Sequence, residues 1–168
     1  GFGALGRATP NDSRVLFVES DAKLRSKRWR IQRAHLVISA MRHFAETLRH
    51  EGFEVDYRTA ESLQAGLAAH RDEYSPTSII ATEPASWDGL ALLRRLGVEL
   101  VRSDQFLCHH DEFAAWATGR KQLRMEDFYR WQRTRLGVLM DGDEPVTGRW
   151  NYDADNRKAW SGQPPEPA

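Results

Sequence analysis

The sequence predicts an α/β fold, a doubly wound, Rossmann-like parallel sheet with extra helices at its C-terminal end. Between residues 15 and 102, short apolar runs alternate with amphipathic helical segments, and the connections are short. The chain of 168 residues, 40% hydrophobic and 29% charged, is long enough for one buried core and too short for two large domains.

Strands are expected where apolar runs rich in β-branched and aromatic residues are bounded by polar turns, at 15–19, 54–58, 78–82 and 99–102. Helices are expected between them, at 28–50, 61–71 and 86–96, the last with Ser86 as its N-cap. The first of these helices carries one apolar stripe, formed by Val37, Met41, Phe44 and Leu48.

The C-terminal third changes character. Two helices are predicted at 111–118 and 125–136, the second with Met125, Phe128, Gln132 and Leu136 on one side. Polar turns are expected after Gly137, and a Gly-Gln-Pro-Pro-Glu-Pro tail follows. We therefore divide the chain into a flexible segment 1–14, an α/β domain 15–145 and a linker or tail 146–168.

The first six residues match the pattern G-x-G-x-x-G. A dinucleotide-binding fingerprint needs a strand before the glycines and a helix opening at the last one. No strand precedes Gly1 in this sequence, and polar residues with Pro10 follow Gly6. We interpret the match as part of the flexible segment.

Charge is unevenly distributed, although 24 basic and 24 acidic residues balance. Residues 22–50 carry eight basic side chains and one acidic, and residues 119–135 carry six and two, whereas residues 51–118 hold twelve acidic against five basic. Two basic blocks predict an anionic partner such as phosphate or nucleic acid, contacted by Arg28, Arg30, Arg33, Arg120 and Lys121. The alternative is that these blocks are solvated helix faces that pair with the acidic middle.

Ligands of open parallel sheets bind beyond the carboxyl ends of the strands. Glu19, with the loop that follows it, and Glu83 with Pro84 stand at two such ends. Both glutamates are candidate ligand contacts, and each can also be a structural or solvated carboxylate.

No metal or catalytic residue is predicted. Adjacent residues of Cys108-His109-His110-Asp111 point in different directions, and no second cluster has ligand spacing, so we interpret the motif as a structural loop. The single cysteine excludes a disulfide framework or thiolate-held cluster within these residues.

No apolar run approaches the roughly 20 residues of a membrane span, and we expect a cytoplasmic location without membrane partners.

Four groups of segments together resemble the bacterial and archaeal deoxyribodipyrimidine photolyase-related proteins, which include iron–sulfur (6-4) photolyases and cryptochromes. These are 39–49 (SAMRHFAETLR); 82–84 with Trp87; 106–108 with 112–121 and 125–130; and 137–142 with 148–158. The resemblance covers 15–158.

The resemblance implies an N-terminal α/β antenna domain followed by a helical domain that binds FAD and a four-iron cluster held by four cysteines. Such a parent protein repairs UV-damaged DNA with light-driven electron transfer from reduced flavin, or senses blue light. Residues 1–168 would then not be catalytic by themselves, and their partners would be the parent's own C-terminal FAD-binding domain and, through it, DNA.

Some relatives bind a ribityllumazine antenna through a carboxylate and an aromatic ring in the loop after the strand that corresponds to 15–19. Lys23 and Ser26 stand at about those places here, and Glu19, Glu83 and Pro84 complete the implied antenna pocket. The family also begins with a central strand ending in a Gly-Asp-Gln-Leu-like motif, which these residues do not contain.

Two alternatives stay open at this point. The chain is either a stand-alone nucleotide- or anion-binding α/β module, or a structural domain that shields a flavin domain without binding a chromophore.

Overall fold

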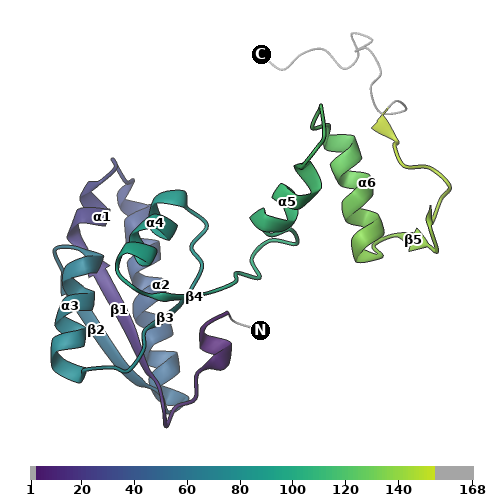
Figure 1. Cartoon of the computed structure of the whole chain (residues 1–168). Coiled ribbons are helices and arrows are strands. Elements are labelled where there is room, and N and C mark those ends of the chain that lie inside the picture. The colour runs from purple at the N-terminus through teal and green to yellow at the C-terminus, as the bar shows by residue number, and fades with distance from the viewer. Residues whose placement is uncertain (1–2, 154–168) are drawn as a thin grey trace. The chain divides into compact units, whose positions relative to one another are not determined.

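The computed structural model describes residues 3–153. The chain divides into two compact units, Gly1–Phe106 and Leu107–Ala168, each with its own internal packing (Figure 1). No helix within 3–153 is both long enough and apolar enough to cross a membrane.

The first unit alternates helices and strands, as the sequence predicts. Its elements in chain order are η1 (Leu5–Arg7), β1 (Arg14–Ser20), α1 (Asp21–Arg25), α2 (Ile31–His50), β2 (Glu54–Ala60), α3 (Leu63–Tyr74), β3 (Ile80–Thr82), α4 (Trp87–Arg95) and β4 (Glu99–Val101). The side chains of Ser62 and Ser86 cap α3 and α4 by accepting hydrogen bonds from Ala65 N and Gly89 N.

The strands form two separate parallel pairs. β1 pairs with β2 from Arg14↔Glu54 to Ser20↔Ala60, and β3 pairs with β4 from Ile80↔Glu99 to Thr82↔Val101. Among the described residues no ladder joins β1 to β3, so the sheet is not continuous. Mixed helices and short parallel strands agree with the predicted α/β class, whereas one uninterrupted sheet is not observed.

Helices α2 and α3 cover opposite faces of the β1–β2 pair. Phe17 of β1 meets Phe44 of α2 with ring centroids 6.0 Å apart. The next residue, Val18, points to the other face because side chains alternate along a strand, and there it lies against Gly66 of α3. A Cβ at residue 66 would lie 2.7 Å from both methyl groups of Val18, so only glycine permits this close approach.

All four strands begin at the same edge of the unit. Arg14, at the start of β1, pairs with Glu54 at the start of β2, and its guanidinium lies 3.6 Å from the ring centre of Tyr74 at the end of α3. Arg71 of α3 donates a hydrogen bond of 2.6 Å to the carbonyl of Leu96, just before β4. The carboxyl ends of the strands, where Ser20 and Thr82 lie, are therefore opposite this edge.

The apolar stripe predicted for α2 is only partly buried. Leu48 is 1% exposed, but Val37 and Phe44 keep 39% and 45% of their surface accessible. Burial of Ala45 and Leu48 holds the C-terminal half of the helix against the strands.

The second unit contains α5 (His110–Ala117), α6 (Met125–Leu136), β5 (Met140–Asp141) and β6 (Glu144–Pro145). Four rings from the two helices, Phe113, Trp116, Phe128 and Trp131, form an aromatic cluster with centroid distances from 5.1 to 6.1 Å.

The structure adds two features of the second unit that the sequence did not indicate. Met125 and Leu136, from the side of α6 noted in the sequence, are exposed, and the buried residue of α6 is Arg133. The segment expected as polar turns contains the short antiparallel pair of β5 and β6.

Candidate functional site

Glu19 lies near the carboxyl end of β1 and is held by side chains from two neighbouring elements. Its carboxylate accepts hydrogen bonds from Arg42 of α2, at 2.7 Å from Nε and 3.1 Å from Nη2, and from the Tyr57 hydroxyl of β2 at 2.5 Å. The Arg42 hydrogen bond is the main cause that lowers the pKa of Glu19, in opposition to burial. Glu19 therefore joins β1, α2 and β2 as a buried carboxylate.

Lys23 and Ser26 lie directly after β1, in and after the short helix α1, where the sequence predicted a polar loop. The Ser20 hydroxyl caps this helix by accepting from Lys23 N at 3.2 Å. Ser26 closes the helix by donating from its hydroxyl to the Lys23 carbonyl at 2.7 Å. Both Lys23 and Ser26 are exposed, so their side chains are accessible to a ligand at this end of β1.

Glu83 and Pro84 follow the carboxyl end of β3, and both are half-buried. The backbone N–H of Glu83 donates to the Val101 carbonyl at 2.9 Å, and its carboxylate accepts from Ser103 N at 3.4 Å. The first unit thus places the predicted pocket residues in two groups, one beyond β1 and one beyond β3.

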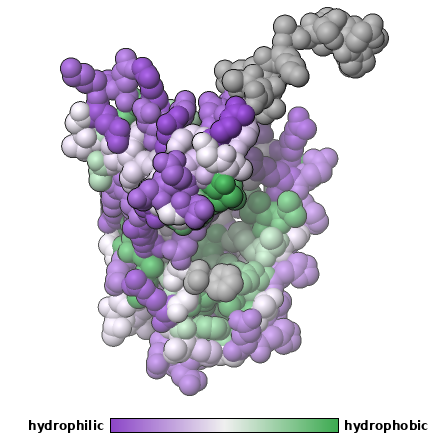
Figure 2. All heavy atoms as spheres, turned by 90° about the vertical axis from the view of Figure 1, so that its right-hand side faces the viewer, coloured by the Kyte–Doolittle hydropathy of each residue, from purple (hydrophilic) through white to green (hydrophobic). Residues whose placement is uncertain are grey.

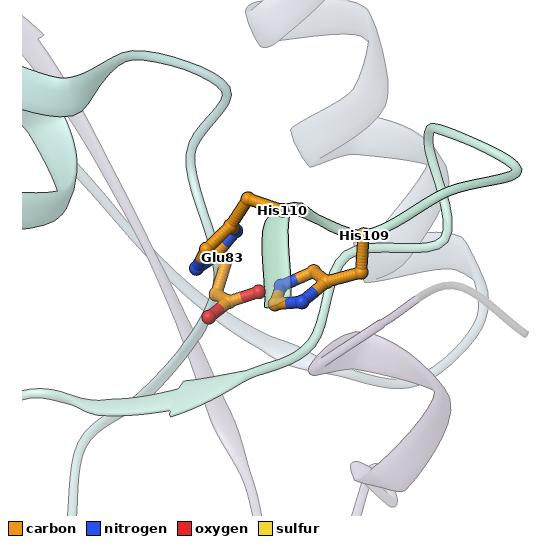
Figure 3. Close-up of side chains that lie close together, drawn as sticks. All are labelled: Glu83, His109 and His110. Atoms are coloured by element: carbon orange, nitrogen blue, oxygen red, sulfur yellow. The ribbon is translucent and has the colours of Figure 1, made fainter. Parts of the chain in front are cut away.

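His109 and His110 stand where α5 begins, and their rings are 3.8 Å apart (Figure 3). The His109 side chain accepts from Asp111 N at 3.3 Å, and the Glu112 carboxylate accepts from His109 N at 2.8 Å. This reciprocal capping box explains the His-His-Asp-Glu sequence as a helix start.

The first basic block surrounds the start of α2. Arg28, Arg30 and Arg33 are exposed, and Arg30 is the N-cap residue, without a capping side-chain hydrogen bond. The Arg33 guanidinium lies 4.7 Å from the ring centre of Trp29, so part of this charge is held near the helix start. Positive side chains and the positive end of the helix dipole coincide there, a combination that favours an anion.

Arg120 and Lys121 belong to the second unit and follow α5. Arg120 donates from Nε to the Trp116 carbonyl at 2.7 Å and lies 4.5 Å from the ring centre of the same tryptophan. Lys121 is exposed in the next turn. Arg120 therefore closes the C-terminal end of α5, while Lys121 is accessible.

A cavity of about 960 Å³ in the first unit is lined by both β1 and β3. Phe44 of α2 lines it from one face of the β1–β2 pair, and Leu67 of α3 lines it from the other. In the lower half of Figure 2, apolar side chains gather in one area with hydrophilic side chains on both sides. Three large side chains of the lining remain exposed, Phe44, Tyr74 and Ile80.

The sequence model of the family described as "Deoxyribodipyrimidine photo-lyase-related protein" matches residues 3–168. The chain belongs to this family. It is 43% identical, over 73% of its length, to "(6-4) photolyase" of Agrobacterium fabrum, and this match covers 26% of that protein. A second match, 40% identical over 23% of the chain, covers 19% of an uncharacterized protein of Acanthamoeba polyphaga mimivirus. The family resemblance expected from the sequence is confirmed.

The photolyase-related chain also contains a buried ionic network that the sequence analysis missed. Asp56 of β2 lies 2.7 Å from His70 Nδ1 of α3 and 2.5 Å from Arg58 Nε, and Arg58 also donates to Glu73 at 2.6 Å. The side chains of Asp56 and His70 are 9% and 6% exposed. The sequence did contain one indication of this network. Asp56 and Arg58 stand two positions apart in a predicted strand, so their side chains are expected on the same face of the sheet, which is therefore charged.

Arg133 is the second residue that was missed. It is 9% exposed and donates to the carbonyls of Val138, at 3.1 Å, and Leu139, as well as to the Tyr129 hydroxyl at 3.1 Å. Its guanidinium also lies 5.3 Å from the ring centre of Trp150. Trp150 thus contacts α6, although the sequence placed it in a linker; residues 154–168 of that linker lie outside the described part of the chain.

Proposed function

We propose that this chain is the N-terminal, antenna-type α/β part of a cytoplasmic, photolyase-related flavoprotein that repairs UV-damaged DNA with light or senses blue light. The observation that carries the proposal is the 43% identity to a (6-4) photolyase over 73% of the chain. The chain spans only 26% of that relative, so the photochemistry is proposed for the whole protein and not for residues 1–168 alone.

The residues present do not fit a four-iron cluster, because such clusters are held by several cysteine thiolates and this sequence has only Cys108. We therefore do not assign the cluster to these residues. In this proposal the cluster and the FAD both belong to the helical domain of the full-length protein, which is also the partner of the present chain.

The two parallel strand pairs are proposed to be the two halves of one doubly wound sheet. Support comes from the common edge at which all four strands begin, marked by Arg14 with Tyr74 and by Arg71 with Leu96. The coverage of both faces of β1–β2 by α2 and α3 is also typical of this fold.

An antenna chromophore of the ribityllumazine class is proposed to bind beyond the carboxyl ends of the strands. Lys23 and Ser26 would contact its polar groups beyond β1, while Glu83 and Pro84 would line the part beyond β3. Glu19 would support this site by holding the end of β1 in place. Its carboxylate would not need to contact the chromophore, because it already accepts hydrogen bonds from Arg42 and Tyr57.

The full-length protein tests this proposal. After purification it should show flavin absorbance, and illumination should restore an oligonucleotide that carries UV lesions. Added ribityllumazine should raise the repair rate of the wild type but not of Lys23→Glu. A protein without flavin would contradict the assignment, and flavin with a photocycle but without repair would identify the photoreceptor branch.

A second candidate function, anion binding at the start of α2, is favoured by the exposed Arg28 and Arg30 at a 20-residue helix. Arg28→Glu with Arg30→Glu should weaken the binding of ADP about tenfold, since two attractive charges become repulsive. Isothermal titration calorimetry measures this change. Arg94→Glu with Arg95→Glu, the same charge change in the last turn of α4, is the control; equal weakening there would show that only net charge matters.

A further inference from the structure

The two basic blocks of the sequence differ in how the structure uses their charges. In the second block, every arginine from 120 to 135 donates a hydrogen bond to a side chain or a carbonyl of the same unit. Arg130, for example, pairs with Glu126, and Arg135 pairs with Glu112 at 3.0 Å. Most of the charge of this block is therefore engaged in contacts inside the second unit.

The first block is engaged only in part. Arg42 and Arg49, in the C-terminal half of α2, have carboxylate partners, as has Arg25 of α1. Within residues 3–153, no carboxylate forms a salt bridge with the other five cations of 22–50, and all five are exposed. We call these five the basic surface: Lys23, Lys27, Arg28, Arg30 and Arg33. Pairing with the acidic middle of the chain therefore does not account for their charge.

Backbone hydrogen bonds order the segment that carries the basic surface. Ser26 donates to the Lys23 carbonyl from its N–H at 3.3 Å and from its hydroxyl at 2.7 Å, and Trp29 N donates to the Lys27 carbonyl at 2.9 Å. The half-buried Trp29 ring also has the Arg33 guanidinium 4.7 Å from its centre. Because the segment is already ordered, a partner would not have to order it on binding.

The composition of the segment favours a polyanion over a lipid surface. A segment that binds at a membrane surface needs a large apolar face beside its cations. Ile31 is the one large apolar side chain of 23–33 that is exposed, because Leu24 and Trp29 are half-buried. No acidic residue occurs from 22 to 45, so no carboxylate of the segment compensates the repulsion among the cations.

The number of unpaired cations also distinguishes between anions. A single phosphate group carries a charge of about −2 at most, which five cations exceed. Successive phosphates of a nucleic acid each carry one negative charge, so a row of them can be matched by a row of cations. Such contacts are independent of the base sequence.

We propose that the basic surface binds the phosphate backbone of duplex DNA without reading its bases. The inference rests on the DNA-directed function proposed above for the full-length protein, and it assigns part of the DNA contact to the α/β part of the chain. It also extends the anion binding proposed at the start of α2 from one phosphate group to several successive ones.

Fluorescence anisotropy with the full-length protein and an undamaged duplex oligonucleotide tests the proposal. Each cation that contacts a phosphate contributes about −0.9 to the slope of log affinity against log salt concentration. Lys27→Gln with Arg28→Gln should therefore reduce the magnitude of this slope by about 1.8 and weaken binding about tenfold at low salt. Within the described residues neither side chain has a polar partner, so the melting temperature should not change.

Arg124→Gln with Arg130→Gln is the matched control. It also removes two exposed arginines, but these already donate to Gln122 and Glu126. The control should keep the slope and the affinity of the wild type. An equal loss in both variants, or no loss in either, would overturn the proposal. Binding to vesicles that contain phosphatidylserine, lost in the first variant while DNA binding is unchanged, would overturn it in favour of a membrane.

The inference and the proposed functions fail in different ways. A protein without flavin whose DNA affinity depends on Lys27 and Arg28 would retain the basic surface and remove the photolyase-like function. Light-driven repair by a flavin-containing protein, with an unchanged slope in the first variant, would do the reverse. Binding of DNA but not of ADP would retain the surface and remove only the single-anion site.

Discussion

Asp56→Ala will destabilise the first unit by about 2–3 kcal/mol, because it leaves the buried His70 without its partner. Asp56 and His70 are 9% and 6% exposed, so water does not replace the lost carboxylate efficiently. Arg58 loses its hydrogen bond to Asp56 but keeps the one to Glu73. Urea unfolding followed by circular dichroism measures the change in the free energy of unfolding.

Asp72→Ala is the matched control, since Asp72 is an exposed carboxylate on α3. It should change the unfolding free energy little. A similar loss in both variants would show that net charge, and not the buried network, is responsible.

The same network gives a pH dependence with a defined sign. Burial raises the pKa of Asp56, but hydrogen bonds from His70 and Arg58 outweigh it and hold this pKa below its usual value. A lowered folded-state pKa contributes stability that is complete above about pH 5 and is lost as the pH falls below about 4. Asp56→Asn should therefore lose less stability than the wild type over that acid range.

Arg133→Met will destabilise the second unit by roughly 2–4 kcal/mol. The substitution keeps a long, unbranched side chain but removes the guanidinium donor of the Val138 carbonyl, and it leaves the Leu139 carbonyl with only the hydrogen bond from Val146 N. Trp116 and Trp131 lie in the same unit, so tryptophan fluorescence during urea unfolding reports the loss.

Arg130→Met is the control for this experiment. Arg130 is also near the Trp150 ring, at 5.6 Å, but its side chain is 46% exposed and pairs with Glu126 at the surface. Its replacement should have little effect. If the two variants behave alike, the contact with Trp150 and not the carbonyl contacts of Arg133 supports this unit.

The elements that the sequence predicted well carry local signals. Ser86 caps α4 through its own hydroxyl, and the apolar run at 15–19 becomes β1. Helix α1 was missed because five residues are too few for helical periodicity, and its stability comes from Ser20 and Ser26. The pairs of two residues in β5 and β6 are likewise too short to show alternation.

The contacts of the candidate site depend on tertiary structure, and local patterns do not encode them. Glu19 was recognised by its place at the end of a strand, but its partners Arg42 and Tyr57 are 23 and 38 residues away along the chain. Arg133 was counted in a basic block by its charge alone. Its burial could not be predicted, because it depends on carbonyl groups of residues that follow the helix. Phe44 was predicted as part of the apolar stripe of a helix, and the described residues leave it 45% exposed beside the cavity.

Gly66 has an influence on residues that it does not touch. His70 and Tyr74 follow it at intervals of four along α3, so all three lie on the face of the helix that meets the strands. Any side chain at residue 66 would lift this helix away from Val18 and would carry His70 and Tyr74 with it. The positions of the Asp56 network and of the cavity wall therefore both depend on the absence of a side chain at residue 66, which belongs to neither.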